Sequence, residues 1–209
     1  MSGSSSSKGP SVDFETTKAQ RAAASTKIVI AGGFGVGKST LVGAVSEIDP
    51  LRTEALVTNE SEGVDDLAAV PTKATTTVAM DFGRLTLAED LVLYLFGTPG
   101  QRRFWFMWDD LCRGAIGAIV LVDVARLDES FSPLDYFESK GIPFIVAVNE
   151  FDGVPRYPAE EIAAALALPA EVPIISLDAR DREQAKGALV KITEYALTRL
   201  RESLTANAN

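Results

Sequence analysis

The sequence predicts one α/β domain, namely a doubly wound, mostly parallel six-stranded sheet with one antiparallel edge strand and helices on both faces. Three observations carry this prediction. Short apolar runs alternate with helical patterns along most of the chain. Most of these runs end in glycine or polar residues, and 209 residues are enough for one sizeable core. Because ligands of such sheets bind beyond the carboxyl ends of the strands, we expect the chemistry in the residues that follow them.

The N-terminal region differs in composition from the rest of the chain. Residues 1–25 are rich in serine, glycine, lysine and alanine and lack an apolar period, so we expect a disordered arm. Ser2 to Ser7 have the composition of an expression-tag remnant. The globular domain is expected over 26–205. Its first strand is predicted at Ile28 to Ala31, which form an apolar, β-branched run bounded by glycine.

The remaining elements follow from the same patterns. Lys38 to Ser46 predict a helix, which Pro50 ends because proline cannot continue it. Leu51 to Lys73 have mixed polarity and are expected to form a long loop with a helical turn near Asp65 to Ala69. The further expected elements, in order, are a hairpin of strands at Thr76–Leu87 and Leu91–Phe96, a helix at Phe104–Leu111, a strand at Ala115–Val122, a helix at Phe131–Ser139, a strand at Pro143–Val148, a helix at Ala159–Leu166, a strand at Pro173–Ser176 and a helix at Arg182–Leu204.

Composition excludes several classes of function. A formal net charge of −9 argues against binding nucleic acid. The chain has no histidine, which removes the commonest general base and the commonest zinc ligand. The single cysteine, Cys112, suits a reducing cytoplasm and is expected to be a small buried hydrophobic residue. No apolar stretch approaches the roughly 20 residues of a membrane span, so we expect a cytoplasmic protein that meets a membrane only through a partner.

The strongest motif is a glycine-rich loop between the first strand and the first helix. Gly32 to Ser39 match G-x-x-x-x-G-K-[ST] without a mismatch. The backbone N–H groups at Gly33, Gly35, Val36 and Gly37 are expected to surround the phosphates, and the helix N-terminus adds about half a positive charge. Lys38 is expected to reach the β- and γ-phosphates, Ser39 to ligate Mg²⁺, and Thr40 to lie near the α-phosphate. The loop alone does not separate ATP from GTP.

Two later segments point to guanine. Asn149 to Asp152 match N-K-x-D, the guanine-reading motif of Ras-like GTPases, except that Glu150 replaces lysine. The Asp152 carboxylate is suited to accept hydrogen bonds from guanine N1–H and N2–H₂, a donor pair that adenine lacks. Asn149 is expected to support the loop. After the last strand, Asp178, Ala179 and Arg180 resemble the S-A-K loop, in which a backbone N–H meets guanine O6.

The segments expected to sense the γ-phosphate are less regular. Gly97 to Gln101 resemble D-T-A-G-Q, with Gly100 placed to touch the γ-phosphate and Gln101 to orient the attacking water. Gly97 stands where an aspartate normally supports Mg²⁺. The stretch Thr77 to Phe82 resembles the T-I-G-V-D-F segment of Rab-type switch I, which makes Thr77 the expected γ-phosphate and Mg²⁺ sensor. Thr76 and Thr75 remain alternatives in register.

Together these motifs resemble a Ras-like small GTPase, and more narrowly the GTPases of actinomycete conservon operons, which are related to the gliding-motility polarity GTPases. The resemblance covers Lys27 to Arg180. It implies a monomeric GDP/GTP switch with Mg²⁺ as cofactor, and sensor-kinase-like or roadblock-type regulatory proteins as partners. Catalysis would fall to Gln101, Thr77 and Lys38. With Gly97 in place of aspartate, we expect slow hydrolysis that a partner completes.

Two other functions stay open. One is a nucleotide-dependent interaction module with negligible hydrolysis, which stays open because Gly97 and Glu150 depart from the GTPase motifs. The other is a P-loop small-molecule kinase, although the sequence offers no convincing arginine-rich lid. The aromatic run Phe104 to Trp108 is expected either to pack against the sheet or to form a partner surface. Arg102 and Arg103 lie beside it and are either surface residues or a source of positive charge for hydrolysis.

Overall fold

The computed structural model describes residues 24–49, 51–58, 75–100 and 102–206. The elements along the chain are β1 (Ala24–Gly32), α1 (Lys38–Val45), β2 (Leu51–Thr58), β3 (Thr75–Ala88), β4 (Leu91–Gly97), the 3₁₀ helix η1 (Arg102–Met107), α2 (Trp108–Cys112), β5 (Gly117–Val122), the 3₁₀ helix η2 (Val124–Arg126), α3 (Asp128–Lys140), β6 (Phe144–Asn149), α4 (Ala159–Ala165), β7 (Ile174–Leu177) and α5 (Arg182–Ala206).

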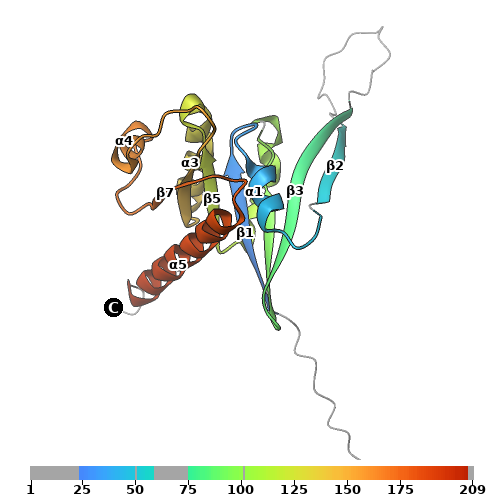
Figure 1. Cartoon of the computed structure of the whole chain (residues 1–209). Helices are drawn as coiled ribbons and strands as arrows, with labels where there is room; N and C mark the ends of the chain where they lie inside the picture. Colours follow the sequence, from blue (N-terminus) through green and yellow to red (C-terminus); the bar gives the residue numbers. More distant parts are fainter. Residues whose placement is uncertain (1–23, 50, 59–74, 101, 207–209) are drawn as a thin grey trace, which may run out of the picture.

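One mostly parallel sheet forms the centre of the molecule (Figure 1). Within the described residues it has seven strands in the order β2-β3-β4-β1-β5-β6-β7. The pairs β4–β1, β1–β5, β5–β6 and β6–β7 are parallel. Strand β3 is antiparallel to both of its neighbours, β2 and β4. The doubly wound sheet with one reversed strand is therefore confirmed, but the reversed strand lies one place inside the edge.

The predicted number of six strands was too low by one, because the edge strand β2 was not predicted. Leu51 to Thr58 form this strand, although Leu51 to Lys73 were expected to be a loop. The strand pairs with β3 from Leu51 opposite Phe82 to Thr58 opposite Thr75. Its sequence carries arginine, glutamate and three threonine or alanine residues, so its strand character comes from pairing with β3 and not from an apolar pattern. The helical turn expected near Asp65 to Ala69 lies outside the described residues.

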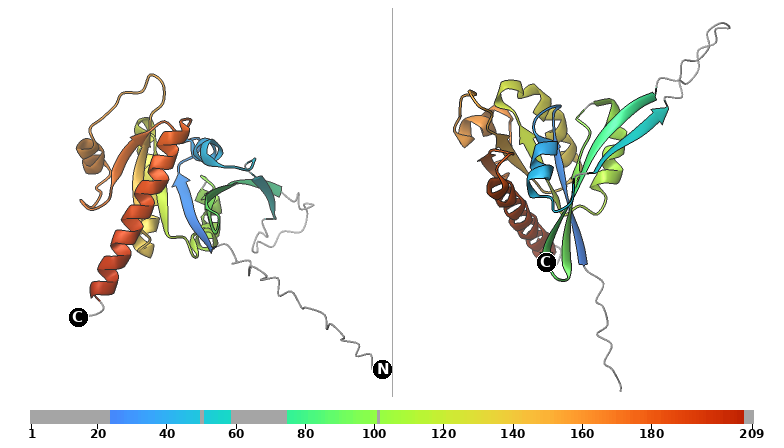
Figure 2. Two further views of the ribbon diagram at one scale, coloured as in Figure 1. Left: turned by 60° about the horizontal axis from the view of Figure 1, so that its bottom comes forward. Right: turned by 45° about the vertical axis from the view of Figure 1, so that its right-hand side comes forward.

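Helices cover both faces of the sheet, and each face has its own core. Helices α1 and α5 lie on one face, where Ile28 and Ile30 of β1 join the apolar side of α5. Helices α2, α3 and α4 contribute to the other face, where Val29 and Ala31 meet Trp108. Figure 2 shows α5 running along its face of the sheet, with the β2–β3 pair at the opposite edge. Successive residues of β1 thus point to opposite faces of the sheet, which is the period-two pattern of a buried central strand.

The other expected elements agree with the structure to within a few residues. The helix predicted at Phe104 to Leu111 is a 3₁₀ turn followed by the short α2. Strand β1 begins at Ala24, two residues before the expected start of the domain, and the rest of the predicted arm lies outside the described residues. Among the helices that the structure describes, including the 25-residue α5, none has both the length and the apolar character that a membrane crossing requires.

Candidate functional site

The glycine-rich loop lies between the carboxyl end of β1 and the first turn of α1. Gly35 and Gly37 have φ values of 71° and 108°, conformations that favour glycine over other residues. The Lys38 ammonium lies along the loop, where Nζ donates hydrogen bonds to the carbonyl oxygens of Gly32 at 2.9 Å and Gly33 at 2.6 Å. The strand, turn and helix predicted from Gly32 to Ser39 are therefore confirmed.

Burial changes the acid–base behaviour of Lys38. The side chain is almost fully enclosed, and this desolvation lowers the pKa of Lys38 from 10.5 to about 8. The nearby Asp81 and Glu129 carboxylates oppose the shift, whereas the Arg126 guanidinium adds to it. A phosphate beside the ammonium would stabilise its charged form.

The first turn of α1 exposes the groups expected to meet phosphate and metal. Gly37 is the N-cap of the helix and supplies no side chain to bond its first N–H groups. Ser39 and Thr40 are both exposed there. The Ser39 hydroxyl donates a hydrogen bond of 2.5 Å to Asp81 Oδ2 on β3. The helix end is thus open toward a ligand, with one hydroxyl held by a carboxylate.

The loop after β4 closes over the phosphate loop. A Cβ atom added to Gly100 would lie 2.9 Å from Lys38 Nζ and 3.0 Å from the backbone nitrogen of Phe34. The structure therefore brings Gly100 beside Lys38, and the expected contact of Gly100 with the γ-phosphate stays a prediction. Gln101 lies outside the described residues. The backbone of Thr77 lies within β3, opposite Leu56 of β2. The catalytic and metal-binding roles of Thr77 stay predictions.

Asn149 connects the phosphate loop to the loop after β7. Its Nδ2 donates to the Val36 carbonyl at 2.9 Å, and its Oδ1 accepts from the Ala179 N–H at 2.9 Å. The residue is only 5% exposed, and a Cβ atom on Gly37 would lie 2.6 Å from Asn149 Nδ2. The structure thus brings three distant segments together through one buried amide.

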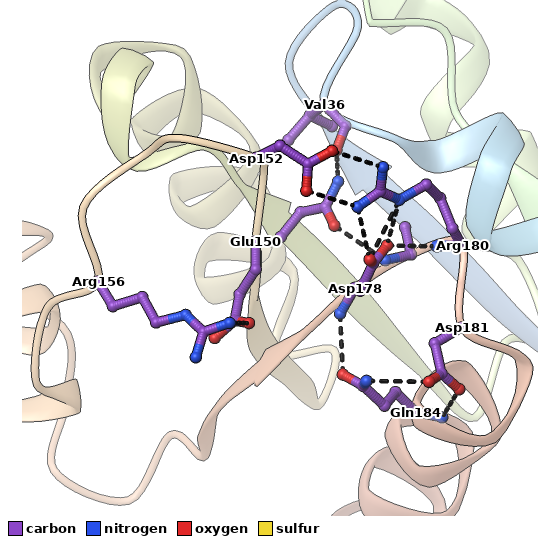
Figure 3. A network of polar contacts seen from close by, with 10 residues as sticks. Val36, Glu150, Asp152, Arg156, Asp178, Arg180, Asp181 and Gln184 are labelled. Carbon is purple, nitrogen blue, oxygen red and sulfur yellow. Dashed lines mark hydrogen bonds and ion pairs between the residues drawn. The ribbon is translucent and has the colours of Figure 1, made fainter.

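Asp152, the residue expected to read the base, lies at the exposed side of this junction. The Arg180 guanidinium donates to Asp152 Oδ2 at 2.9 Å and to Oδ1 at 3.1 Å, and it also contacts both oxygens of Asp178 (Figure 3). These hydrogen bonds lower the pKa of Asp152, and they lower the pKa of Asp178 to about 2. Both carboxylates therefore remain charged under neutral conditions, and a single arginine bridges them.

The backbone donors of the same loop have acceptors within the protein. The N–H of Asp178 donates to Gln184 Oε1 at 2.9 Å, and the N–H of Arg180 donates to Asp178 Oδ1 at 2.8 Å. The N–H of Ala179 is the donor to Asn149 described above. A base oxygen arriving at Ala179 would therefore share this N–H with Asn149 or displace its amide.

Glu150, the departure from the guanine-reading motif, points away from Asp152. Its carboxylate forms an ion pair with Arg156 in the segment before α4 (Figure 3). Glu150 and Arg156 also line a small hollow together with Val124, Phe151 and Tyr157. The glutamate is therefore satisfied by its own partner, and its charge is not aimed at Asp152.

Sequence reasoning missed a cluster after β5 that holds the phosphate loop. Arg126 donates through Nη1 to the Phe34 carbonyl at 2.9 Å and through Nε to Asp123 Oδ2 at 3.0 Å. Glu129 lies beside it, and a Cβ atom on Gly33 would come within 2.8 Å of the Glu129 Cβ. The signal was present, because Asp123 directly follows a buried central strand, where polar residues gather around the ligand.

The aromatic run after this loop divides between core and surface. Trp108 is 1% exposed and stacks on Phe137, and Phe104 is also buried. Trp105 packs partly buried against Trp108, whereas Phe106 is 65% exposed. The expected core packing therefore holds for Phe104 and Trp108, whereas a partner surface at the exposed Phe106 stays a prediction. Cys112 is buried as expected, and burial raises the pKa of its thiol.

The donor set at the first turn of α1 fits Mg²⁺. This ion prefers oxygen ligands and keeps several waters and phosphate oxygens around it. The Ser39 hydroxyl and the Asp81 carboxylate supply two such oxygens at one place. Across the described ranges there is no group of three or more His, Cys, Asp or Glu side chains that would hold a metal without a ligand. The residues therefore suit a metal that arrives with a phosphate.

Comparison with known folds agrees with this geometry. The chain has the fold of the G domain of FeoB from Methanococcus jannaschii, with a TM-score of 0.53 and 15% identity over 82% of this chain and 98% of that one. The G domain of the FeoB iron transporter of T. maritima gives a TM-score of 0.57 and 20% identity over 83% of this chain and 99% of that one. The fold is therefore that of a P-loop GTPase.

Two sequence relatives are named as a GTP-binding protein and a Ras-related protein. The GTP-binding protein ypt1 of Schizosaccharomyces pombe is 23% identical over 193 residues, which are 88% of this chain and 85% of the yeast protein. The Ras-related protein RIC1 of Oryza sativa is 25% identical, over 88% of this chain and 86% of the rice protein.

A protein from Methanocaldococcus jannaschii, named Uncharacterized protein MJ1339, is 34% identical over 128 residues, which are 60% of this chain and 70% of the archaeal protein. A family described as "Conserved hypothetical ATP binding protein" matches residues 30–199. This match includes the phosphate loop, Asn149 and the loop after β7. The chain therefore belongs to the family of conserved hypothetical ATP binding proteins, on the fold of a P-loop GTPase domain.

Proposed function

We propose that the chain is a small GTP-binding protein that cycles between GDP and GTP states with Mg²⁺ and hydrolyses GTP slowly. The observation that supports this most is the position of Asn149, which bonds both Val36 and Ala179. One buried amide thereby sets the Asp152 carboxylate and the loop of Ala179 beside the loop expected to hold phosphate. A nucleotide needs its base-binding loop and its phosphate-binding loop at a fixed separation. The hydrogen bonds of Asn149 therefore suit a nucleotide-binding site.

The choice of guanine depends on Asp152. A carboxylate accepts two hydrogen bonds from the N1–H and N2–H₂ groups of guanine, and adenine has no such pair. In the structure the Arg180 guanidinium, itself a planar pair of N–H donors, binds the same Asp152 carboxylate. Guanine would therefore exchange with an arginine that offers the same pattern of donors.

A specific observation favours ATP as a second candidate, namely the description of the family to which the chain belongs. Adenine would leave the pair of Asp152 and Arg180 intact, because it offers the carboxylate only one exocyclic amino group. The two candidates therefore differ in what happens to a single ion pair. The Ras-related relatives and the G-domain fold weigh toward guanine.

A departure in the switch segments supports slow hydrolysis, and the resemblance to Ras-like switches supports a regulatory role. Gly97 brings no carboxylate from β4, and the catalytic roles of Gln101 and Thr77 are proposals from motif resemblance. The cytoplasmic location, the monomeric state and the regulatory partners of roadblock or sensor-kinase type stay predictions from the sequence. A switch of this kind has to differ in structure between its two nucleotide states.

Isothermal titration of nucleotide-free protein with GDP and with ADP, each with and without Mg²⁺, tests the proposal. Guanine selection predicts at least about tenfold tighter binding of GDP, because hydrogen bonds from guanine to the charged Asp152 carboxylate contribute on the order of 1.5–3 kcal/mol that adenine does not supply. Equal affinities, or tighter binding of ADP, would overturn the guanine assignment. Asp152→Asn should reduce the preference for GDP and improve binding of xanthosine diphosphate, whose base offers an acceptor where guanine offers an amino group.

A further inference from the structure

A pocket opens between the phosphate loop, the first two turns of α3 and the aromatic run after β4. We call it the aromatic pocket, and it encloses about 230 Å³. Sites for whole small molecules usually enclose about 300–1,000 Å³, so this pocket has the size for a single side chain. The lining residues that matter for its chemistry are Gly33, Phe34, Trp105, Trp108, Glu129 and Pro133.

The wall of the aromatic pocket is formed mainly by indole rings. The ring centroids of Trp105 and Trp108 lie 5.6 Å apart, and Trp105 is only partly buried. Phe34, at the tip of the phosphate loop, is 67% exposed. Tryptophan is the side chain whose ring face attracts a cation most strongly, and an exposed aromatic ring gains free energy when a partner covers it. The wall therefore suits a side chain that is both flat and cationic.

Glu129 adds a carboxylate to this wall. A Cβ atom added to Gly33 would collide with Glu129 Oε2, so the carboxylate lies against the backbone of the phosphate loop. Arg126 pairs with Glu129 at 3.4 Å, but it bonds Asp123 more closely, at 3.0 Å. Two carboxylates thus share one guanidinium. A carboxylate has about four acceptor positions, and the Glu129 side chain is 38% exposed, so Glu129 can bind a second cation.

We propose that the aromatic pocket binds an arginine side chain of a partner protein, with Glu129 as its counter-ion and the Trp105 ring as its platform. A planar guanidinium can stack on an aromatic ring and donate from its edge to a carboxylate at the same time, which the compact ammonium of lysine cannot do. The net charge of −9 also favours a basic partner. Because Glu129 would neutralise its charge, this arginine anchors the partner and is not a source of charge for hydrolysis.

This proposal goes beyond the proposed function and does not depend on which nucleotide binds. The intrinsic fluorescence of the full chain tests it directly, because Trp105 and Trp108 are the two tryptophans of the sequence and both line the pocket. The probes are three capped peptides, Gly-Arg-Gly, Gly-Lys-Gly and Gly-citrulline-Gly, of which the last keeps the shape of arginine without its charge.

We expect a saturable change of fluorescence with the arginine peptide, with a dissociation constant in the millimolar range. The citrulline peptide should bind at least about fivefold more weakly, which is the upper range for a partly exposed ion pair. The lysine peptide should also bind more weakly than the arginine peptide, because it cannot stack and bond at once. Equal binding of the three peptides, or no saturable change with the arginine peptide, would overturn the proposal.

Variants then separate recognition of the charge from a structural effect. Glu129→Gln should weaken the arginine peptide at least about fivefold and leave the citrulline peptide unchanged within about twofold. A distortion of the pocket would instead weaken both peptides alike, and this result would contradict the proposal. Glu138→Gln makes the same change at an exposed position of the same helix and should bind as the unaltered chain does.

A second variant tests the platform and does not depend on the first. Trp105→Leu should weaken the arginine peptide by about two- to fivefold, the range of a cation–π contact at an exposed site. Trp108 still reports the binding in this variant. A thermal unfolding curve for each variant checks that it is folded. Arginine binding that is unchanged in folded Glu129→Gln, or in folded Trp105→Leu, would refute the assignment of that residue and with it the proposed pose.

Discussion

Replacing Asn149 by alanine is the perturbation for which the structure gives the most direct magnitude. The amide is 5% exposed and makes two hydrogen bonds of 2.9 Å, one to the Val36 carbonyl and one from the Ala179 N–H. Alanine would remove both and strand the two backbone groups in the interior. An unsatisfied buried group costs about 1–3 kcal/mol, so Asn149→Ala is expected to lower the free energy of unfolding by about 2–4 kcal/mol.

Urea unfolding monitored by tryptophan fluorescence measures this loss, because Trp108 is buried in the core. Leu197→Ala, on the exposed side of α5, is the control and should change the free energy of unfolding by less than about 0.5 kcal/mol. A loss below about 1 kcal/mol for Asn149→Ala would refute the reasoning. It would mean that the Val36 and Ala179 backbone groups find other partners without the amide.

A double-mutant cycle with Gly37→Ala tests the same contact from the other side. The φ of 108° at Gly37 disfavours alanine by about 1–3 kcal/mol, whatever surrounds it. The added Cβ would also lie 2.6 Å from Asn149 Nδ2 and force the amide to move. That second cost disappears once Asn149 is alanine, so the two losses should fall short of additivity by about 1 kcal/mol or more. If the two losses of unfolding free energy were additive, Gly37 and Asn149 would not be in contact, and the prediction would be refuted.

Three further predictions concern other parts of the molecule. Because burial lowers the pKa of Lys38 to about 8 and a bound phosphate favours the charged form, nucleotide binding should take up a proton above pH 8. The nucleotide affinity is then full below pH 8 and falls by up to about tenfold per pH unit above pH 8. Calorimetry at pH 9 in buffers of different ionisation enthalpy should detect the proton uptake. Identical binding heats in all buffers would contradict this prediction. Arg180→Ala should tighten GDP binding by up to about fivefold, since the exposed pair with Asp152 is worth at most about 1 kcal/mol, and leave ADP binding unchanged; a weaker GDP affinity would make the arginine itself a base contact. Trp108→Ala should cost about 3–5 kcal/mol of stability in a urea titration, whereas Phe106→Ser, at a side chain 65% exposed, should cost less than about 0.5 kcal/mol; similar losses would refute the division of the aromatic run.

The central sheet was predictable because its strands carry their own signal. Strand β5 is apolar throughout and β6 is apolar up to its last residue, Asn149, and both are buried on both faces, so a short β-branched run is sufficient to locate them. Strand β2 carries no such signal, since it is an edge strand specified by pairing with β3. Local sequence identifies elements that bury both faces, and it misses those whose stability comes from one neighbour.

The site was predictable to the extent that single segments define it. The phosphate loop and Asn149 were found because their chemistry depends on short motifs, one matched throughout and the other matched except at Glu150. Arg126 and Asp81 were missed because their roles depend on contacts across the sheet, with Phe34 and Ser39 respectively. Spacing along the chain contains no information about which strands become neighbours. Only the register of the sheet places Asp81 opposite Gly97.

At both departures from the Ras-like motifs, Gly97 and Glu150, a neighbouring side chain accounts for the change. At Gly97 the missing carboxylate leaves a space that Asp81 fills from the adjacent strand. At Glu150 the reversed charge forms an ion pair with Arg156. A motif position describes a place beside the ligand, and any element that reaches the place with the right chemistry can occupy it. The departures therefore argue for rearranged contacts within a nucleotide site and not for the loss of that site.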